Sequence, residues 1–571
     1  MPDCREAVLS NEYADFIMEY NVAPERIFEE YGDFCVQIMG VRYSAIYAKR
    51  AAIPDLSIKE YTYTAIPKLY GLMDTGAVEE TGSLKLQNQP NLNLTGRNVI
   101  VGFIDTGINY AHKAFLDTYG KSRILRIWDQ TNQEGTPPSG FYYGTEFTNE
   151  DIDLALAGNN PFKLVNSIDE NGHGTFLAGV ACGSVDEEND FAGAAPESKI
   201  VMVKLKPAKQ YLRDFYYIKD DTEAYQENDI MLAVHYLDRI SIQYGLPLVI
   251  IIGLGTNTGG HDGLSPLAGQ LDYMAGNIGH SVVVCAGNEG NSQHHYRGNL
   301  FSSGMSLSDM LFEDVQFRTG ENEKGFLMEL WGHAPDIYAV SIHAPTGESI
   351  PRIAAGIGQS DKYTFLLNST VIYIDYRVVE QQSGDELIAM RFENPTSGIW
   401  TVRVYGSNIL NGIYDVWLPI SEFTSEDTYF LQPNPDVTIT MPGTAGNVIA
   451  VSSYNNSTDS FYSDSGRGFT RLNAIKPDIA APGVNVFGPS LSGSRYTRRS
   501  GTSVSAALTG GVCAQLLQWG ITDGNASEMR NNNIRSYLIR GARKNRNIVY
   551  PSREWGYGEL DGYNTFVSLA R

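Results

Sequence analysis

The residues best suited to chemistry in this 571-residue chain are an aspartate, a histidine and a serine in three separate motifs. Asp105 ends the apolar run VIVGFID, His173 lies between two glycines in NGHGTFLAGVACG, and Ser503 lies in the small-residue segment SGTSVSAALTGG. A serine hydroxyl becomes a nucleophile when a histidine takes its proton and an acid orients that histidine. The three residues together predict hydrolysis through an acyl-enzyme.

Each motif taken alone also has a simpler structural interpretation. An aspartate after a strand often caps a turn, a lone histidine is often structural, and a serine at a helix start is a common N-cap. The chain order favours catalysis, because Asp, His and Ser follow one another as in subtilisin and not as in chymotrypsin or the α/β-hydrolases. A helix starting at Ser503 also favours the negative charge that develops in such a reaction.

A fourth motif supplies a hydrogen-bond donor for that charge. Asn288 follows the strand-like run VVVCAG, between His173 and Ser503 in the chain. A side-chain amide in this place can donate to the oxyanion of a tetrahedral intermediate.

The motifs DTGIN, NGHGT, AGNEG and GTSVSAA resemble the four signature motifs of the subtilase (subtilisin-like) serine protease family. The resemblance implies that Ser503 attacks the scissile carbonyl, that His173 transfers the proton, and that Asp105 stabilises the histidine. It also implies that Asn288 and the backbone N–H of Ser503 bind the oxyanion. The similarity covers residues 65–310 and 430–571.

The same resemblance implies a substrate-binding edge that pairs with the substrate backbone as an added strand. Its residues are Gly253, Leu254, Gly255, Ala286 and Gly287.

Two positions depart from the family pattern. Gly253 stands where the family usually has serine, and the segment VSAA stands where Met-Ala-x-Pro usually follows the nucleophile. Backbone pairing needs no side chain at Gly253, so we expect little loss of activity. The missing proline should alter helix packing and not the nucleophile.

The apolar runs predict an α/β fold with a subtilisin-like parallel sheet covered by helices on both faces. NVIVGFID, KIVMVKLK, LPLVIIIGLG and HSVVVCAG are strand-length runs that alternate with helical segments. Short strands with Gly, Pro and Asn turns from about residue 310 to 420 predict an inserted all-β jelly roll or sandwich. We therefore divide the chain into an α+β propeptide (1–64), a catalytic domain in two parts (65–310 and 431–571) and the β insert (311–430).

This layout and GTSVSAA resemble the clostridial germination-specific (Csp-type) subtilases. The resemblance implies limited processing of a protein zymogen such as a spore-cortex hydrolase, and a propeptide that acts as a chaperone and can stay in the cleft. AIPKLYGL resembles the start of a mature subtilase, which predicts self-cleavage near residues 63–65, although an ordinary linker is the alternative. Other open interpretations are a non-catalytic pseudoprotease or sensor, a gut-bacterial subtilase with another protein substrate, and a general scavenging protease.

The composition argues against two kinds of binding partner, nucleic acid and the membrane interior. The net charge of −23 argues against nucleic acid, and no apolar run approaches the roughly 18 residues of a membrane span. The acidic N-terminus does not resemble a secretory signal, so we expect synthesis in the cytoplasm. The Csp-type resemblance implies deposition in the spore.

Cysteines and metals add little to the prediction. The five cysteines are scattered, so we expect buried thiols at Cys182, Cys285 and Cys513 and no disulfide framework. No cofactor is required and no metal ligand is assigned. The acidic run at residues 187–190 offers oxygen ligands of the kind calcium prefers, but a solvated loop is the simpler interpretation.

Overall fold

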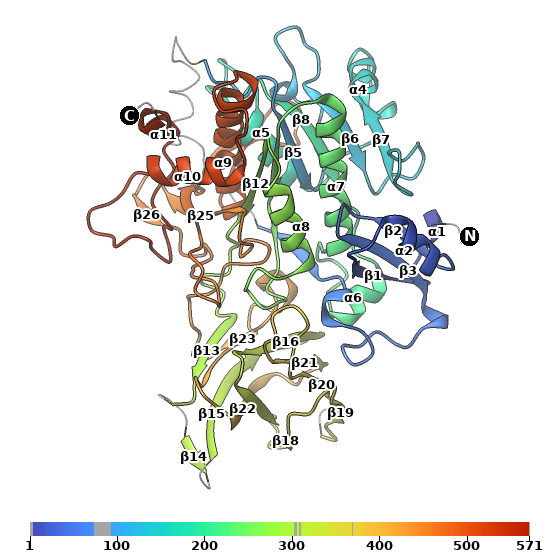
Figure 1. The fold of residues 1–571 in the computed structure, drawn as a ribbon, viewed down its shortest axis with the longest axis vertical. Helices are drawn as coiled ribbons and strands as arrows, with labels where there is room; N and C mark the ends of the chain where they lie inside the picture. The colour runs from blue at the N-terminus through green and yellow to red at the C-terminus, as the bar shows by residue number, and fades with distance from the viewer. Residues whose placement is uncertain (1–3, 74–92, 302–304, 308–309, 368, 570–571) are drawn as a thin grey trace.

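The computed structural model describes residues 4–73, 93–301, 305–307, 310–367 and 369–569 (Figure 1). The N-terminal unit lies beside α6 and α7, and an all-β unit projects from the lower end of the α/β body in the view of Figure 1. The predicted fold class is confirmed: a large, mostly parallel sheet carries helices on both faces, and two further antiparallel sheets form the insert.

The N-terminal unit is a three-stranded antiparallel sheet with strand order β1-β3-β2 and short helices. Its elements are α1 (Cys4–Leu9), β1 (Tyr13–Glu19), α2 (Pro24–Glu30), β2 (Cys35–Ile38), β3 (Tyr43–Lys49), η1 (Arg50–Ala52), η2 (Tyr63–Ala65) and β4 (Leu69–Leu72). Tyr43 and Tyr47 of β3 share a core cluster with Met231 and Leu267 of the α/β body. The unit is thus packed against the body by apolar burial.

Cys4 and Cys35 form a disulfide, so the prediction of no disulfide was wrong for this pair. The two residues are 31 positions apart in sequence, but packing of α1 against β2 brings their Cα atoms to 5.3 Å. That distance is within the range a disulfide spans. The other cysteines, Cys182, Cys285 and Cys513, are buried free thiols, as predicted.

The central sheet has the order β26-β25-β12-β10-β5-β8-β6-β7, and β27 pairs with β25. Its strands are β5 (Ile100–Asp105), β6 (Ile124–Asp129), β7 (Thr145–Thr148), β8 (Lys199–Lys204), β10 (Leu248–Ile252), β12 (His280–Cys285), β25 (Ile449–Asn455), β26 (Ser460–Phe461) and β27 (Ile479–Pro482). Among the strands that the structure describes in this sheet, only the pairs β6–β7 and β25–β26 are antiparallel.

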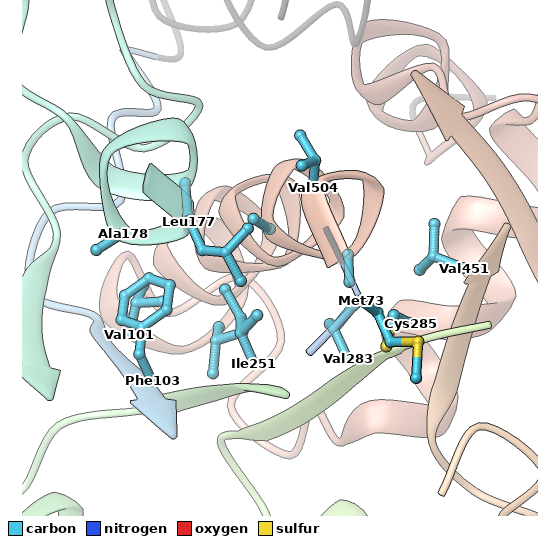
Figure 2. Close-up of a cluster of buried hydrophobic side chains, with 14 of the residues drawn as sticks. Met73, Val101, Phe103, Leu177, Ala178, Ile251, Val283, Cys285, Val451 and Val504 are labelled. Carbon is cyan, nitrogen blue, oxygen red and sulfur yellow. The ribbon is translucent and has the colours of Figure 1, made fainter. Parts of the chain in front are cut away.

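Alternate side chains of the central strands enter two separate cores. On β10, Val249 and Ile251 pack with the helices α5 and α9, whereas Ile250 and Ile252 pack with α7 and α8. This follows from the two-residue period of a strand, and it explains why β10 is apolar at every position. Figure 2 shows Ile251 and Phe103 beside Leu177 of α5 in the first of these cores.

The remaining elements of the body surround the sheet. They are the helices α4 (Asn149–Leu156), α5 (His173–Cys182), α6 (Gln210–Phe215), α7 (Glu227–Tyr244), α8 (Pro266–Ala275), α9 (Thr502–Leu517), α10 (Asn531–Gly541) and α11 (Gly562–Leu569), the short helices η3 (Lys113–Phe115), η4 (Pro161–Lys163) and η6 (Gln518–Thr522), and the strands β9 (Tyr225–Gln226), β11 (Leu254–Gly255), β28 (Val486–Pro489) and β29 (Tyr496–Arg499). Among the described helices, the segment 502–522 alone is long and apolar enough to cross a membrane, and 89% of its apolar window is buried inside the fold.

The insert is a sandwich of two antiparallel sheets. One sheet contains β13 (His295–Asn299), β23 (Ile413–Trp417), β16 (Gly325–Gly332), β21 (Leu387–Glu393), β20 (Val371–Arg377) and β19 (Ser360–Thr364). The other contains β14 (Met305–Leu307), β15 (Met310–Thr319), β22 (Gly398–Asn408), β17 (Ile337–His343), β18 (Ser349–Ile353) and β24 (Tyr429–Phe430). The sandwich starts at β13, before the boundary at residue 311 that the sequence predicts.

Candidate active site

Asp105 and His173 meet where β5 ends and α5 begins. Asp105 is the last residue of β5, and its Oδ1 lies 2.7 Å from Nδ1 of His173, the first residue of α5. The backbone N–H of Thr106 donates to the same carboxylate oxygen at 2.8 Å. Gly172 precedes the helix with φ = 88°, a left-handed conformation that favours glycine. The sharp turn at Gly172 therefore aims the imidazole at the end of the sheet.

Ser503 approaches the other nitrogen of the ring from helix α9. Its Oγ lies 3.2 Å from Nε2 of His173, and both residues are fully buried. When Nδ1–H donates to Asp105, Nε2 is the acceptor that can take the serine proton. The residues are 68 and 330 positions apart in sequence, and they form one continuous hydrogen-bonded chain.

Asn288 is held next to this chain by Thr502. The backbone N–H and the hydroxyl of Thr502 both donate to Asn288 Oδ1, at 3.1 and 3.0 Å. Fixing the amide oxygen leaves the NH₂ group as the donor on the opposite side. The backbone N–H of Ser503 provides a second donor at the N-terminus of α9, where the helix dipole favours negative charge.

The cleft next to these groups is filled by the chain's own strand β4. It lies antiparallel between β11 and β9, pairing Leu72 with Leu254, Gly71 with Gly255, and Tyr70 with Tyr225. The three strands form a small sheet in the order β11-β4-β9, with β4 in the centre. An extended segment is therefore bound by backbone pairing, as a peptide substrate is when it augments a sheet edge.

Met73 follows β4 and lies against the nucleophile. Its N–H donates to the Gly253 carbonyl at 3.1 Å, and its own carbonyl oxygen accepts from the Ser503 N–H at 3.1 Å. Its side chain is buried in the cluster that also contains Cys285 and Val504, as Figure 2 shows. The carbonyl of Met73 is thus the carbonyl group presented to Ser503.

Comparisons with known proteins agree with this geometry. Residues 96–306 and 425–558, more than half of the chain, match the sequence profile of the subtilase family. The chain belongs to the subtilase family. Among solved structures it is similar to the CspB protease of Clostridium perfringens, with 31% identity and a TM-score of 0.76 over 86% of this chain and 96% of that chain.

A curated relative matches a shorter part of the subtilase chain. The C5a peptidase of Streptococcus pyogenes is 34% identical over 99 residues, which are 17% of this chain. That match spans 8% of the length of the relative. The family assignment therefore depends on the longer comparisons above and not on this short segment.

The structure does not bring residues 63–65 to the nucleophile of this subtilase. Tyr63–Ala65 form the short helix η2, which cannot pair as an extended strand. The Tyr63 hydroxyl donates to Glu329 of the insert at 2.7 Å, and the Tyr63 carbonyl accepts from Lys68 Nζ at 2.9 Å. The strand β4 and not η2 occupies the cleft, so the carbonyl next to Ser503 is that of Met73 and not one from residues 63–65.

The five predicted substrate-binding residues have different roles in the structure. Gly253 and Gly255 line the strand β4 and Met73 directly; a Cβ atom on Gly255 would lie 3.1 Å from the Met73 Cε. Gly287 donates its N–H to the Thr502 hydroxyl at 3.1 Å and has φ = 88°. The backbone of Ala286 is used in pairing, because its N–H donates to Val451 and its carbonyl accepts from Thr440.

Ala507 stands at the family's proline position and is fully buried, whereas Ser505 makes a polar contact at the start of α9. The Ser505 hydroxyl donates to the carbonyls of Ala481 and Pro482 at 2.9 and 3.1 Å. This fixes the first turn of α9 to β27.

Sequence reasoning did not find Asp169, which organises the start of α5. One carboxylate oxygen accepts from the Thr106 hydroxyl and the Gly172 N–H, at 2.9 and 2.8 Å. The other accepts from the Thr175 N–H and hydroxyl, at 3.0 and 2.6 Å. Its place four residues before His173, ahead of a glycine turn, was the available signal, because an acid there can cap the helix.

Other reactive groups are not part of this arrangement. Burial raises the pKa of the Cys285 thiol to about 12, so the thiol is protonated and a poor nucleophile at neutral pH. Within the described residues no group of three or more His, Cys, Asp or Glu side chains is arranged to hold a metal ion. Asp186, beside the acidic run at 187–190, accepts from the Tyr496 hydroxyl and pairs with Lys113.

Proposed function

We propose that this subtilase is a serine endopeptidase that cleaves its own chain after Met73 and then processes a protein zymogen by limited proteolysis. The observation that carries the proposal is the position of the Met73 carbonyl. Its oxygen accepts a hydrogen bond from the Ser503 N–H, and Ser503 Oγ is at the same time within hydrogen-bond distance of His173 Nε2. A carbonyl held by an oxyanion donor next to a serine–histidine pair is poised for acyl transfer.

The reaction follows from these contacts. Ser503 Oγ attacks the Met73 carbonyl carbon as His173 Nε2 takes the hydroxyl proton, and the oxyanion is stabilised by the Ser503 N–H and the Asn288 amide. His173 then gives the proton to the amide nitrogen of the next residue, Asp74, and the C–N bond breaks. Water, deprotonated by His173, releases Met73 as a free carboxylate and restores Ser503. Asp105 stabilises the imidazolium in both halves, and no cofactor is needed.

The proposed substrate is supported only by the similarity of this chain to Csp-type proteases. The Csp-type layout and the similarity to a clostridial CspB protease favour a spore-cortex hydrolase zymogen cleaved during germination, with the enzyme made in the cytoplasm and deposited in the spore. A buried nucleophile whose cleft is filled by the chain's own strand favours restricted processing over bulk digestion.

The test is intact mass and N-terminal sequencing of the wild type and Ser503→Ala expressed side by side. We expect the 62.9 kDa wild-type chain to split with a new N-terminus at Asp74, and the Ser503→Ala chain to stay whole. A wild type that remains intact after long incubation would favour the pseudoprotease interpretation. A split at residues 63–65 would show that β4 does not mark the cut.

A further inference from the structure

Gly71 is the third residue before the bond presented to Ser503, and it is buried in the middle of β4. It pairs with Gly255, so its backbone is held in register with the substrate-binding strand β11. Its φ lies outside the left-handed region, so its backbone conformation is open to any L residue. Whether another residue is tolerated at this position is decided by the space around it.

That space is closed by the connection that leaves the inserted sandwich. After β23 the chain forms η5 (Ser421–Phe423) directly over β4. A Cβ atom on Gly71 would lie 2.6 Å from Ile420 Cδ1, 2.8 Å from Glu422 Oε2 and 3.5 Å from Phe423 Cε1. The first two distances are well inside van der Waals contact, so a side chain on residue 71 requires residues 420–423, which form the wall of this space, to move.

Ile420 is the rigid part of the wall. It is 1% exposed and belongs, with Phe423, to the main core cluster of the α/β body. The N–H and hydroxyl of Ser421 both donate to Oε1 of the buried Glu289, at 3.0 and 2.8 Å. The Glu422 side chain is exposed, whereas the buried Ile420 can make room only by repacking the core.

We propose that residues 420–423, contributed by the inserted sandwich, make the cleft selective for glycine at the third residue before the cut. The inference rests on the proposed endopeptidase function and names its substrate class: extended polypeptides with glycine at that position and room for a long unbranched residue at the cut. It also gives the insert a role, because the wall exists only through the connection that follows β23. Overpacking of this kind lowers the rate about tenfold for alanine and about a hundredfold or more for a larger side chain.

Self-cleavage of the full chain measures this selectivity. Gly71→Ala should slow cleavage after Met73 about tenfold, and Gly71→Leu should slow it further. Ile420→Val deletes only Cδ1, the atom at 2.6 Å, so it should restore most of the rate lost in Gly71→Ala. Ile479→Val is the matched control, because it makes the same deletion at a buried position of β27 and should restore nothing.

A second measurement is independent of catalysis. In the Ser503→Ala chain, Gly71→Ala should lower the denaturant midpoint, although Gly-to-Ala changes at unstrained positions normally raise it by restricting the unfolded chain. Adding Ile420→Val should reverse part of that loss, giving a coupling between the two positions in a double-mutant cycle.

The outcomes separate the two proposals. A wild type that does not cleave itself contradicts the proposed function. The denaturant midpoints then test separately whether residues 420–423 restrict the space at residue 71. A wild type that cleaves after Met73 together with Gly71→Leu cleaving equally fast overturns the glycine selectivity. If Gly71→Ala leaves the denaturant midpoint unchanged and shows no coupling to Ile420→Val, then Ile420 does not restrict the space at residue 71, and the proposed wall is contradicted.

Discussion

The amide of Asn288 matters chiefly when negative charge develops on the Met73 carbonyl oxygen. Its orientation is fixed by the two hydrogen bonds from Thr502, so the donor is in place before the reaction starts. Preorganised donors of this kind stabilise the transition state more than the bound substrate. The residue should therefore affect the rate of cleavage and not the position of β4.

We expect Asn288→Ala to slow self-cleavage after Met73 by about 10²–10³, the loss known for the equivalent donor in subtilisin itself. Time courses followed by intact mass would measure the rate, with Ser503→Ala as the inactive reference. A rate within a few-fold of wild type would show that the Ser503 N–H alone binds the oxyanion.

Gly253, where the family usually has serine, has little room for a side chain. A Cβ atom there would lie 2.7 Å from Leu177 Cδ1, 3.0 Å from His173 Cε1 and 3.1 Å from Ser503 Cβ. We expect Gly253→Ser to displace the imidazole and slow self-cleavage about tenfold, the range of ordinary overpacking. Equal or faster cleavage in the same time course would mean that the site already accommodates the usual serine.

At the scale of the elements, the start of α5 depends on one carboxylate. Asp169 joins β5 to α5 through Thr106, Gly172 and Thr175, so it positions the histidine without touching the substrate. Losing the charge of a buried carboxylate with several hydrogen bonds costs about 3 kcal/mol of folding free energy.

We expect Asp169→Asn to lower the free energy of unfolding by about that amount and to slow self-cleavage as well. Chemical denaturation in the Ser503→Ala background measures the first effect and intact mass the second. Asp151→Asn is the control, because Asp151 caps α4 away from the site and should lower stability without changing the rate. Asp169→Asn with wild-type stability and rate would contradict the positioning role.

The sandwich contains a buried acid whose protonation links its stability to pH. Glu386 Oε2 accepts from the Tyr338 N–H at 2.7 Å, and within the described part of the chain Oε1 has no hydrogen-bond partner. Burial raises the pKa of Glu386 to about 8. The folded chain therefore holds a proton that the unfolded chain releases between pH 4.5 and 8, so stability falls as pH rises through that window.

Replacing the acid by a neutral isostere should remove this slope. We expect Glu386→Gln to be more stable than the parent at pH 8, by an amount on the order of a few kcal/mol, and similar to it near pH 4.5. Denaturation of the Ser503→Ala chain across that range provides the measurement. Parallel pH profiles for the two chains would show that Glu386 is ionised in the fold.

Features that depend on one short segment of sequence could be predicted, whereas features that depend on contacts between distant segments could not. The runs that precede Asp105 and end at Ile252 contain no charged or polar side chain, so the buried strands β5 and β10 can be predicted from sequence. The segment that lies next to Ser503 could not be placed from sequence, because β4 is defined by pairing with β11 and β9, which lie more than 150 residues further along the chain. The Cys4–Cys35 pair and the early start of the sandwich at β13 likewise depend on packing between distant segments.

At the scale of the whole molecule, a buried ion pair fastens the N-terminal unit to the body. Asp15 of β1 lies 2.5 Å from Lys209 Nζ and also accepts from Gln226 at 2.7 Å and Asn228 at 3.2 Å. Burial lowers the pKa of Lys209, and Asp15 counteracts this. Removing one member of such a pair leaves a buried charge uncompensated and costs about 3–5 kcal/mol.

We expect Asp15→Ala to weaken retention of the N-terminal piece after cleavage. In size-exclusion chromatography of the cleaved wild type the two pieces should elute together, and in Asp15→Ala they should separate. Glu19→Ala is the control, because Glu19 forms an exposed pair with Arg42 inside the unit and should leave retention unchanged. Co-elution in Asp15→Ala would mean that apolar packing of β3 on the body is sufficient.

The filled cleft has a consequence that begins at the moment of cutting. While the chain is whole, β4 is tethered to the cleft and its occupancy does not depend on how much protein is present. Once the bond after Met73 is broken, the same strand becomes one end of a separate molecule that binds by mass action. We therefore expect the proposed cleaved form to respond to dilution: its cleft should stay closed where the protein is concentrated and open where the protein spreads into a larger volume.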